Sequence, residues 1–290
     1  MRLIARAAVA VLFGYAVVAP VHGAATLTFT TIDVPGAVGT QAAGINHQGD
    51  IVGAYTDAAG QQHGFLRSAS QYRTIDVPDV RSTFARGIND AGDIVGSYIR
   101  QVETTSVPNH GFLLTRRGGL QAVDYPGHLN TIAQRILNDG TILGCYHDTD
   151  TMGTMHGFEF DRGFSAIDMA MSMHNGATPD GKYIVGLFMD DDGRNKAYVM
   201  EGEKMSAVEV PGALSTSGWD VNPSGVMVGE YTDAAGAAHA FTDDHGVFTR
   251  IDVPDATATR GRGINDRGDI VGIYVDRSGR THGFLAEVTR

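Results

Sequence analysis

The sequence contains one cysteine, Cys145, one tryptophan, Trp219, and few basic residues, with 22 Lys and Arg against 33 Asp and Glu. A single cysteine excludes an internal disulfide, so the fold depends on burying apolar surface, for which a chain of 290 residues is long enough. The net charge of -11 repels phosphate backbones and anionic lipids. These properties argue against nucleic acid as a partner and against membrane insertion.

The only long apolar run lies at the start of the chain. Arg2 and Arg6 precede an apolar stretch over residues 7–19, and small residues follow at 23–25. This run is too short for a stable membrane span and is typical of a secretory signal. We expect residues 1–24 to be removed, with cleavage either before Ala24 or just after Ala25, and residues 25–290 to form one domain that is secreted or periplasmic.

After the signal, one unit is repeated six times. Its clearest copy is Gly263-Ile-Asn-Asp-Arg-Gly-Asp-Ile-Val-Gly272, followed by Tyr274 and by His282-Gly-Phe284. The glycine that ends the first part recurs every 42–48 residues, at Gly53, Gly96, Gly144, Gly186, Gly229 and Gly272. A period of about 40–50 residues is typical of propeller blades and of some helical arrays.

The residue types favour the propeller. Each unit consists of short β-branched and aromatic runs that are broken by Asn-Asp, Asp-x-x-Gly and Pro turns, and no stretch is long enough for a helix. Four such strands per unit predict an all-β, six-bladed β-propeller of four-stranded blades. The mature chain begins with an outermost strand over residues 28–35 and stops at a third strand over residues 284–288. We therefore expect the ring to close by pairing the N-terminal strand with the last blade, which leaves no unpaired edge.

The unit resembles the extracellular bacterial repeat named for its His-Ala-Phe (HAF) signature. The literal triplet occurs once, at His239-Ala240-Phe241, four units have His-Gly-Phe, and one departs with Lys196-Ala197-Tyr198. The resemblance covers the whole mature chain and implies export and a propeller. It brings no activity and no catalytic residues.

Residues that repeat in every unit are interpreted as scaffold. A side chain present in nearly every blade usually satisfies buried polar groups between strands, so we expect a network of Asn, His and Asp within or between blades. Its members are the histidines at 63, 110, 156, 239 and 282, Asn46, Asn89, Asn138, Asn222 and Asn265, and Asp33, Asp76, Asp124, Asp168 and Asp252, with Glu209 in place of the fifth unit's aspartate.

Function is expected where the units differ. The position before Gly-Ile-Asn should line one mouth of the central channel, and an alignment of the units places Ala43, Arg86, Arg135, Asn175, Trp219 and Arg262 there. Residues one and two steps earlier include His174 and Arg260. Guanidinium groups pair with carboxylate, sulfate or phosphate through two parallel hydrogen bonds, and an indole face stacks on a sugar ring. The predicted ligand-binding residues are Arg86, Arg135, His174, Trp219, Arg260 and Arg262. The alternative is that these arginines pair with neighbouring acids such as Asp220 and seal the channel.

Three functions follow from this mouth. The first is the binding of an acidic oligosaccharide or another small anion or saccharide without chemistry. The second is an interaction scaffold of the cell envelope that binds an exported protein, and the third is a polysaccharide lyase or hydrolase with His174 as the catalytic candidate. No nucleophile elbow, phosphate loop or zinc-binding His-Glu-x-x-His motif occurs, and we expect no cofactor and no metal.

Two further features stay open at the level of sequence. The run Asp190-Asp191-Asp192-Gly193 could hold calcium but lacks the other ligands of a calcium loop, so an acidic hairpin tip is favoured. Longer hairpins at residues 101–109 and 147–153 either cover the arginine-lined mouth or are tolerated surface insertions.

Overall fold

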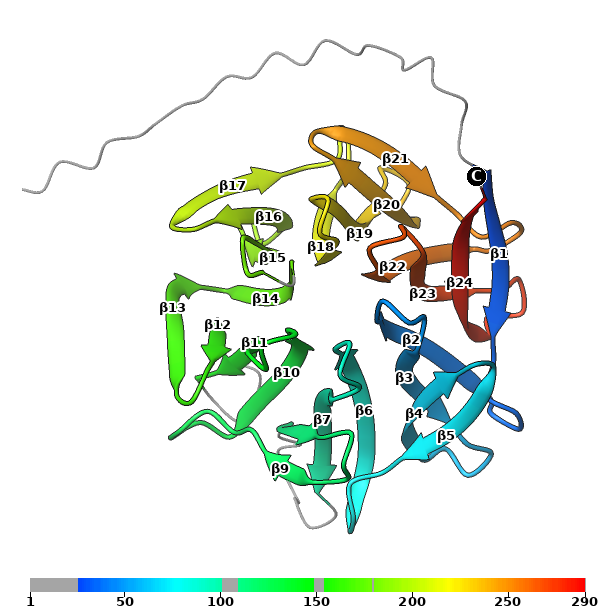
Figure 1. Cartoon of the computed structure of the whole chain (residues 1–290). Helices are drawn as coiled ribbons and strands as arrows, with labels where there is room; N and C mark the ends of the chain where they lie inside the picture. The colour runs from blue at the N-terminus through cyan, green and yellow to red at the C-terminus, as the bar shows by residue number, and fades with distance from the viewer. Residues whose placement is uncertain (1–25, 101–108, 149–153, 179, 290) are drawn as a thin grey trace, which may run out of the picture.

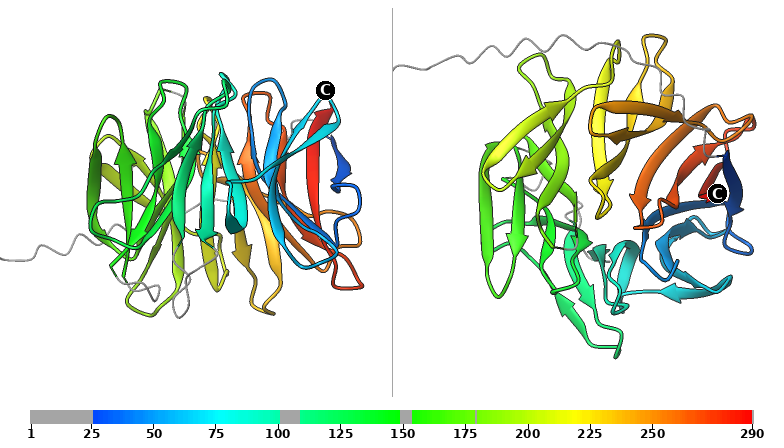
Figure 2. Two further views of the ribbon diagram at one scale, coloured as in Figure 1. Left: turned by 90° about the horizontal axis from the view of Figure 1, so that it is seen from below. Right: turned by 45° about the horizontal axis from the view of Figure 1, so that its top comes forward.

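The sheets of this protein are arranged as a ring around a central axis (Figure 1). The computed structural model describes residues 26–100, 109–148, 154–178 and 180–289. All secondary-structure elements within these residues are β-strands. The predicted signal peptide, the loop at residues 101–108, and residues 149–153 lie outside the described part. The strands run along the height of the ring, and loops lie at its two ends (Figure 2).

Four sheets contain four strands each. The first three comprise β10 (Asn130–Ile136), β11 (Ile142–His147), β12 (Met155–Phe160) and β13 (Phe164–Ala170); β14 (Ser172–Ala177), β15 (Tyr183–Met189), β16 (Asn195–Glu201) and β17 (Lys204–Val208); and β18 (Ser215–Val221), β19 (Val226–Thr232), β20 (Ala238–Asp244) and β21 (Val247–Ile251). The fourth comprises β22 (Ala258–Ile264), β23 (Ile270–Val275), β24 (Thr281–Thr289) and β1 (Thr26–Ile32).

The fifth sheet has eight strands, so the expected six separate four-stranded sheets are not observed. Its members are β2 (Gly39–Ile45), β3 (Ile51–Thr56), β4 (Gln62–Ser68), β5 (Gln71–Ile75), β6 (Val80–Ile88), β7 (Ile94–Arg100), β8 (His110–Leu114) and β9 (Leu120–Ala122). A single parallel bridge between Gln62 and Ser82 joins β4 to β6. The reason is that β6 is nine residues long and has an extra irregularity between Val80 and Ser82, which brings its start against β4.

The innermost strands β2, β6, β10, β14, β18 and β22 contact one another in order, and β22 contacts β2. The ring is therefore closed, and the chain is an all-β propeller.

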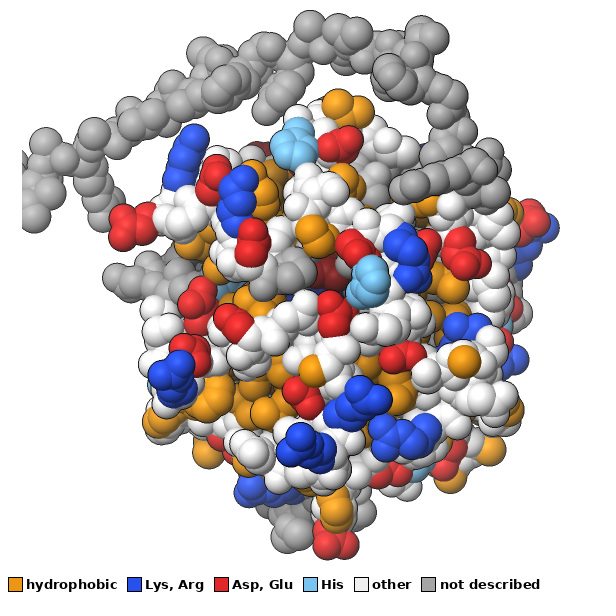
Figure 3. Space-filling view, in the orientation of Figure 1, with side chains coloured by type: hydrophobic (Ala, Val, Ile, Leu, Met, Phe, Trp, Pro, Cys, Tyr) orange, Lys and Arg blue, Asp and Glu red, His pale blue; other side chains and the backbone are white. Residues whose placement is uncertain are grey.

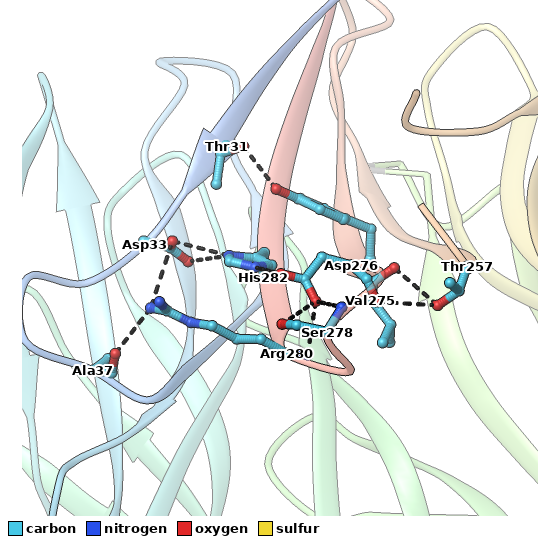
Figure 4. Close-up of polar contacts among 10 residues, drawn as sticks. Thr31, Asp33, Ala37, Thr257, Val275, Asp276, Ser278, Arg280 and His282 are labelled. Atoms are coloured by element: carbon cyan, nitrogen blue, oxygen red, sulfur yellow. Dashed lines mark hydrogen bonds and ion pairs between the residues drawn. The ribbon is translucent and has the colours of Figure 1, made fainter. Parts of the chain in front are cut away.

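The N-terminal strand closes the last sheet, as expected. β1 pairs antiparallel with β24 from Thr26 opposite Thr289 to Ile32 opposite Gly283. At the end of this seam, His282 Nδ1 lies 2.9 Å from Asp33 Oδ2, and Arg280 donates to the carbonyl of Ala37 at 3.0 Å (Figure 4). The paired edge would otherwise present free N–H and C=O groups.

The repeated glycine of each unit is required by close backbone contact. A Cβ on Gly53 would lie 1.9 Å from the carbonyl oxygen of Gln41 and 2.8 Å from the Phe65 ring, and one on Gly96 would meet Phe84 and Phe112 in the same way. The side chains of Phe65 and Phe112 are buried. The absence of a side chain at this glycine therefore leaves room for the carbonyl of the innermost strand and for the phenylalanine ring.

The predicted scaffold network is present as a His held between two acids. His239 Nδ1 lies 3.1 Å from Asp252 and its Nε2 lies 3.1 Å from Asp233, while Tyr231 packs against the imidazole at 5.1 Å between ring centroids. His63 and His282 have the same two partners in their own units. The asparagines do not join this network, because Asn46 caps its own turn and donates to the carbonyl of Asn89 in the next unit. The side chain of Asp168 lies outside the described part.

The unit that lacks this histidine has compensating substitutions. Lys196 replaces the histidine and contacts Glu209 at 2.8 Å, and Asp190 lies on its other side at 3.6 Å. The longer Glu209 and the longer cation therefore preserve the order acid, cation, acid. The Asp190 carboxylate also accepts from the backbone N–H groups of Asp192 and Arg194, as an acidic hairpin tip does.

Candidate functional site

A β-bulge interrupts each innermost strand at the same height in the ring. The bulge leaves one unpaired residue per strand, and these residues are Ala43, Arg86, Gln134, Asn175, Trp219 and Arg262. All of them line a single cavity of about 150 Å³ on the axis. Bulges commonly redirect side chains at the ends of strands, and here they bring together residues that lie up to 219 positions apart.

The structure corrects the alignment in the third unit. Gln134, and not Arg135, is the bulge residue that corresponds to Arg86 and Arg262. Arg135 occupies the next position, where four units have the glycines Gly44, Gly87, Gly176 and Gly263 and where the fifth unit has Asp220.

Arg135 and Asp220 form an ion pair across the channel. Arg135 Nη2 lies 3.1 Å from Asp220 Oδ2, and the two side chains are 8% and 6% exposed. Asp220 also accepts from the backbone N–H of Ile264 at 3.0 Å, and Arg135 donates to the carbonyl of Arg262 at 3.3 Å. Burial raises the pKa of Asp220 to about 6, against the opposing attraction of Arg135. The pairing with Asp220 that the sequence left as an alternative is therefore observed for Arg135.

Arg86 is the basic residue of the mouth without an acidic partner in the described part of the chain. Its Nε donates to Ser97 Oγ at 3.2 Å, its Nη1 lies 3.4 Å from Gln134 Oε1, and its guanidinium carbon lies 4.4 Å above the Phe84 ring. Burial lowers its pKa to about 10, so the side chain remains a cation at neutral pH. A half-buried cation held only by neutral groups is suited to an anionic ligand.

The other arginines gather on Glu230. Arg260 Nη1 lies 2.6 Å from Glu230 Oε2, and Arg262 Nη1 lies 3.2 Å from Glu230 Oε1. Burial would raise the pKa of Glu230, but Arg262 and Arg260 outweigh it and the pKa is lowered. Two cations share one carboxylate, so this cluster keeps a net positive charge. Arg262 lines the cavity, whereas Arg260 and Glu230 do not.

Trp219 is not the free stacking platform that the sequence suggested. The guanidinium of Arg262 covers one face of the indole at 4.0 Å, and the indole N–H donates to Glu230 at 3.2 Å. A cation over an indole face is attracted by the ring quadrupole. Trp219 therefore helps to hold Arg262 in place at the cavity wall.

His174 does not reach the mouth. Its side chain is 0% exposed, and Nδ1 forms a short hydrogen bond to the Tyr198 hydroxyl, which itself donates to the carbonyl of Met173 at 3.0 Å. Burial lowers the pKa of His174 to about 3. The residue does not line the cavity, so the expectation that it acts there as a ligand or a general base is wrong.

The residue that sequence reasoning missed is Glu230. It follows the repeated Gly229, and the residues in its position are Ala54, Ser97, Cys145, Leu187, Glu230 and Ile273. The two strongly polar members, Ser97 and Glu230, are those that hold Arg86 and Arg262. A polar residue at this otherwise apolar position is the sequence feature that could have identified Glu230 as part of the site.

A second cavity of about 110 Å³ lies on the other side of Arg135, which lines both. Its wall is formed by the Asn-Asp turns, including His47, Asp90 and Asp266.

In the face seen in Figure 3, acidic and basic side chains are intermixed, and acidic side chains with a histidine lie near the centre.

The described residues offer little for metal binding or for nucleophilic chemistry. They contain no group of three or more His, Cys, Asp or Glu side chains arranged to hold a metal ion. Cys145 is fully buried, and burial raises the pKa of its thiol to about 12. Across these same residues, no helix has the length and hydropathy needed to span a membrane.

Comparison with known proteins supports the fold. No protein-family model and no curated protein matches the sequence. The β-propeller domain of the Trilobed protease from Pyrococcus furiosus is similar with a TM-score of 0.54 and 10% identity, covering 88% of this chain and 97% of that one. A mutant of the Aleuria aurantia lectin in complex with alpha-methyl-L-fucoside has a TM-score of 0.52 at 8% identity, with 90% and 96% covered. TolB from Acinetobacter baumannii has a TM-score of 0.53 at 15% identity, with 86% and 64% covered. At these identities the similarity shows a propeller and no particular activity.

Proposed function

We propose that this protein is an exported repeat propeller that binds a small anionic or saccharide ligand at the arginine-lined mouth of its axial channel. In this proposal residues 1–24 direct export to the periplasm or the exterior, and residues 25–290 act as one domain of the HAF-repeat type. The eight-stranded sheet counts as two blades joined by the Gln62–Ser82 bridge, which gives six blades in all.

The observation that carries this proposal is the state of Arg86. It lines a cavity, it stays charged at neutral pH, and no carboxylate in the described residues neutralises it. The Arg260–Glu230–Arg262 cluster adds a further net positive charge beside it. Positive groups in a cleft of an acidic protein concentrate an anion there.

The cavity volume limits what enters. A cavity of about 150 Å³ holds a molecule of roughly one six-membered ring. One sugar unit, free or at the end of an oligosaccharide, fits this limit. The fucoside complex of the Aleuria aurantia lectin shows that a propeller of similar fold carries a sugar ligand in another protein.

Calorimetry with D-glucuronate and with a galacturonate trimer tests the proposal. We expect binding by the mature protein and at least a tenfold loss in Arg86→Gln, because Arg86 is a cavity cation that pairs with no carboxylate of the described residues. Arg277→Gln is the matched control, since Arg277 is exposed and pairs with Asp255. No binding at millimolar ligand, or equal binding by the two variants, would overturn the proposal.

A scaffold function is favoured by a separate observation. Val38, Leu129 and Leu214 occupy corresponding turns of three units and are 53%, 57% and 48% exposed. Exposed apolar side chains repeated in this way suit a protein partner. Replacing all three by serine should abolish capture of an exported protein from a periplasmic extract without changing glucuronate binding. Unchanged capture would exclude these turns as the interface.

The enzyme alternative loses its catalytic candidate, because His174 lies outside the cavity. We therefore do not propose a lyase or hydrolase.

A further inference from the structure

Asn175 lines the cavity and carries a buried hydrogen-bond acceptor without a partner in the described residues. The residue is 1% exposed and is the bulge residue of β14. Its side-chain nitrogen donates to the carbonyl of Gly218 at 2.8 Å. Because that carbonyl can only accept, the amide orientation is fixed, and the oxygen Oδ1 is the end left over. Oδ1 has no hydrogen-bond partner in the part of the chain that the structure describes.

An acceptor buried in this way is costly. Leaving a buried polar atom unpaired costs about 1–3 kcal/mol relative to a satisfied one. A ligand that donates a hydrogen bond to Oδ1 recovers this free energy on binding. A ligand that satisfies both residues of this cavity must donate a hydrogen bond to Asn175 and carry a negative charge for Arg86.

From this pair of requirements we infer that the ligand is a hydroxylated carboxylate of one-ring size, that is, a sugar acid. The inference rests on the proposed binding function and specifies its ligand. The carboxylate pairs with Arg86 and a ring hydroxyl donates to Asn175 Oδ1. Sulfate has no hydroxyl donor at neutral pH and leaves Oδ1 unpaired. A neutral sugar leaves the charge of Arg86 unpaired. Sites built to bind a hydroxyl discriminate strongly against an analogue that lacks it.

Three probes separate these contributions in the mature protein. Calorimetry compares D-glucuronate, which has both groups, with cyclohexanecarboxylate, which lacks the hydroxyls, and methyl β-D-glucoside, which lacks the charge. We expect glucuronate to bind at least tenfold more tightly than either analogue. Equal binding of cyclohexanecarboxylate and glucuronate would overturn the sugar-acid inference and leave anion binding at the mouth intact. Equal binding of the glucoside and glucuronate would overturn the inference as well, because it removes the role of the charge. No binding of any probe would overturn both proposals.

A variant locates the effect. Asn175→Ala removes the acceptor and should lower glucuronate affinity at least fivefold while leaving cyclohexanecarboxylate affinity within twofold. Asn138→Ala is the control, because Asn138 is an amide that binds Asp90 beyond the ion pair, at the other cavity. An equal loss for both probes in Asn175→Ala, at unchanged thermal stability, would contradict the hydrogen bond to Oδ1. If Asn175→Ala fails to fold, the comparison of the three probes on the unmodified protein still decides the inference.

Discussion

Replacing Arg135 and Asp220 by glycine, singly and together, tests how the ring is sealed. Four of the units have glycine at this position, and their backbones pack closely there: a Cβ on Gly44 would lie 2.8 Å from the carbonyl of Arg86 and 3.0 Å from Arg135 Nη1. The double variant therefore restores the residue that the rest of the ring uses. Each single variant leaves one charge buried without its partner.

The magnitudes follow from the burial of the pair. Removing one partner of a buried ion pair costs about 3–5 kcal/mol. Asp220→Gly should reach this range above pH 6, where Asp220 is ionised in the unmodified protein, because Arg135 does not lose its proton and is left without a partner. Arg135→Gly should cost less in acid, because the remaining Asp220 can take up a proton. The double variant should cost about 1–2 kcal/mol, from two added glycines at about 0.5–1 kcal/mol each.

The pH dependence of Arg135→Gly has a defined sign. The pKa of Asp220 is raised to about 6 even with Arg135 present, and removing the cation raises it further. A group with a raised folded-state pKa stabilises below its unfolded value of about 4, and this contribution is lost as the pH rises through the folded value. The variant should thus be less stable at pH 8 than at pH 5, by about 1.4 kcal/mol for each pH unit that the folded pKa lies above 5.

Urea unfolding at pH 5 and pH 8 measures all four proteins. The coupling free energy between the two substitutions should be about 3 kcal/mol or more at pH 8. If the double variant is destabilised by the sum of the single variants, the two side chains do not depend on one another and the reasoning fails.

Three further predictions concern other parts of the ring. Tyr198→Phe should lower the free energy of unfolding by about 1–3 kcal/mol, because the buried His174 loses its partner, and His174→Ala in the same chain should recover part of it; full stability of Tyr198→Phe in urea would contradict this. Glu230→Gln keeps one of the two acceptor oxygens but removes the charge that competes for the arginines, so calorimetry should show roughly three- to tenfold tighter glucuronate binding; weaker binding would count against an anionic ligand. The pKa values of Asp57 and Asp233 are lowered, first by backbone N–H groups of their own turns and also by their histidines, so their stabilisation is present above about pH 4 and lost below it. Replacing both by asparagine should flatten the thermal stability curve between pH 5 and pH 3, and an unchanged slope would show that these carboxylates do not set it.

The propeller and its closure could be predicted from sequence because they depend on local, repeated spacing. The glycine at Gly272 recurs in all six units, the histidine at His282 recurs in five of them, and the strand over residues 28–35 lacks a unit of its own. Each repeated residue meets the same local requirement in its unit. The eight-stranded sheet could not be predicted, because it depends on one bridge at the start of β6.

The mouth could be predicted only in part, because a shift of one residue changes which side chain faces the axis. Leu137 stands where four other units have asparagine, and Asn138 follows it, so aligning the asparagines placed Arg135 at the bulge instead of Gln134. His174 was misplaced for a different reason. It occupies a position that is small in the other units, and its contact with Tyr198 depends on packing between strands.

The seam between β1 and β24 has a consequence for how the molecule is made. Its contacts join Asp33 to His282, 249 residues apart, so the first strand to leave the ribosome has no partner until almost the whole chain is complete. Contacts of such long range are slow to form, and a chain arrested before β24 presents an unsatisfied edge. An edge of that kind accepts a strand from another copy. Shortening the chain at either end of the seam should therefore yield dimers or larger assemblies that associate through the opened edges, in place of folded monomers.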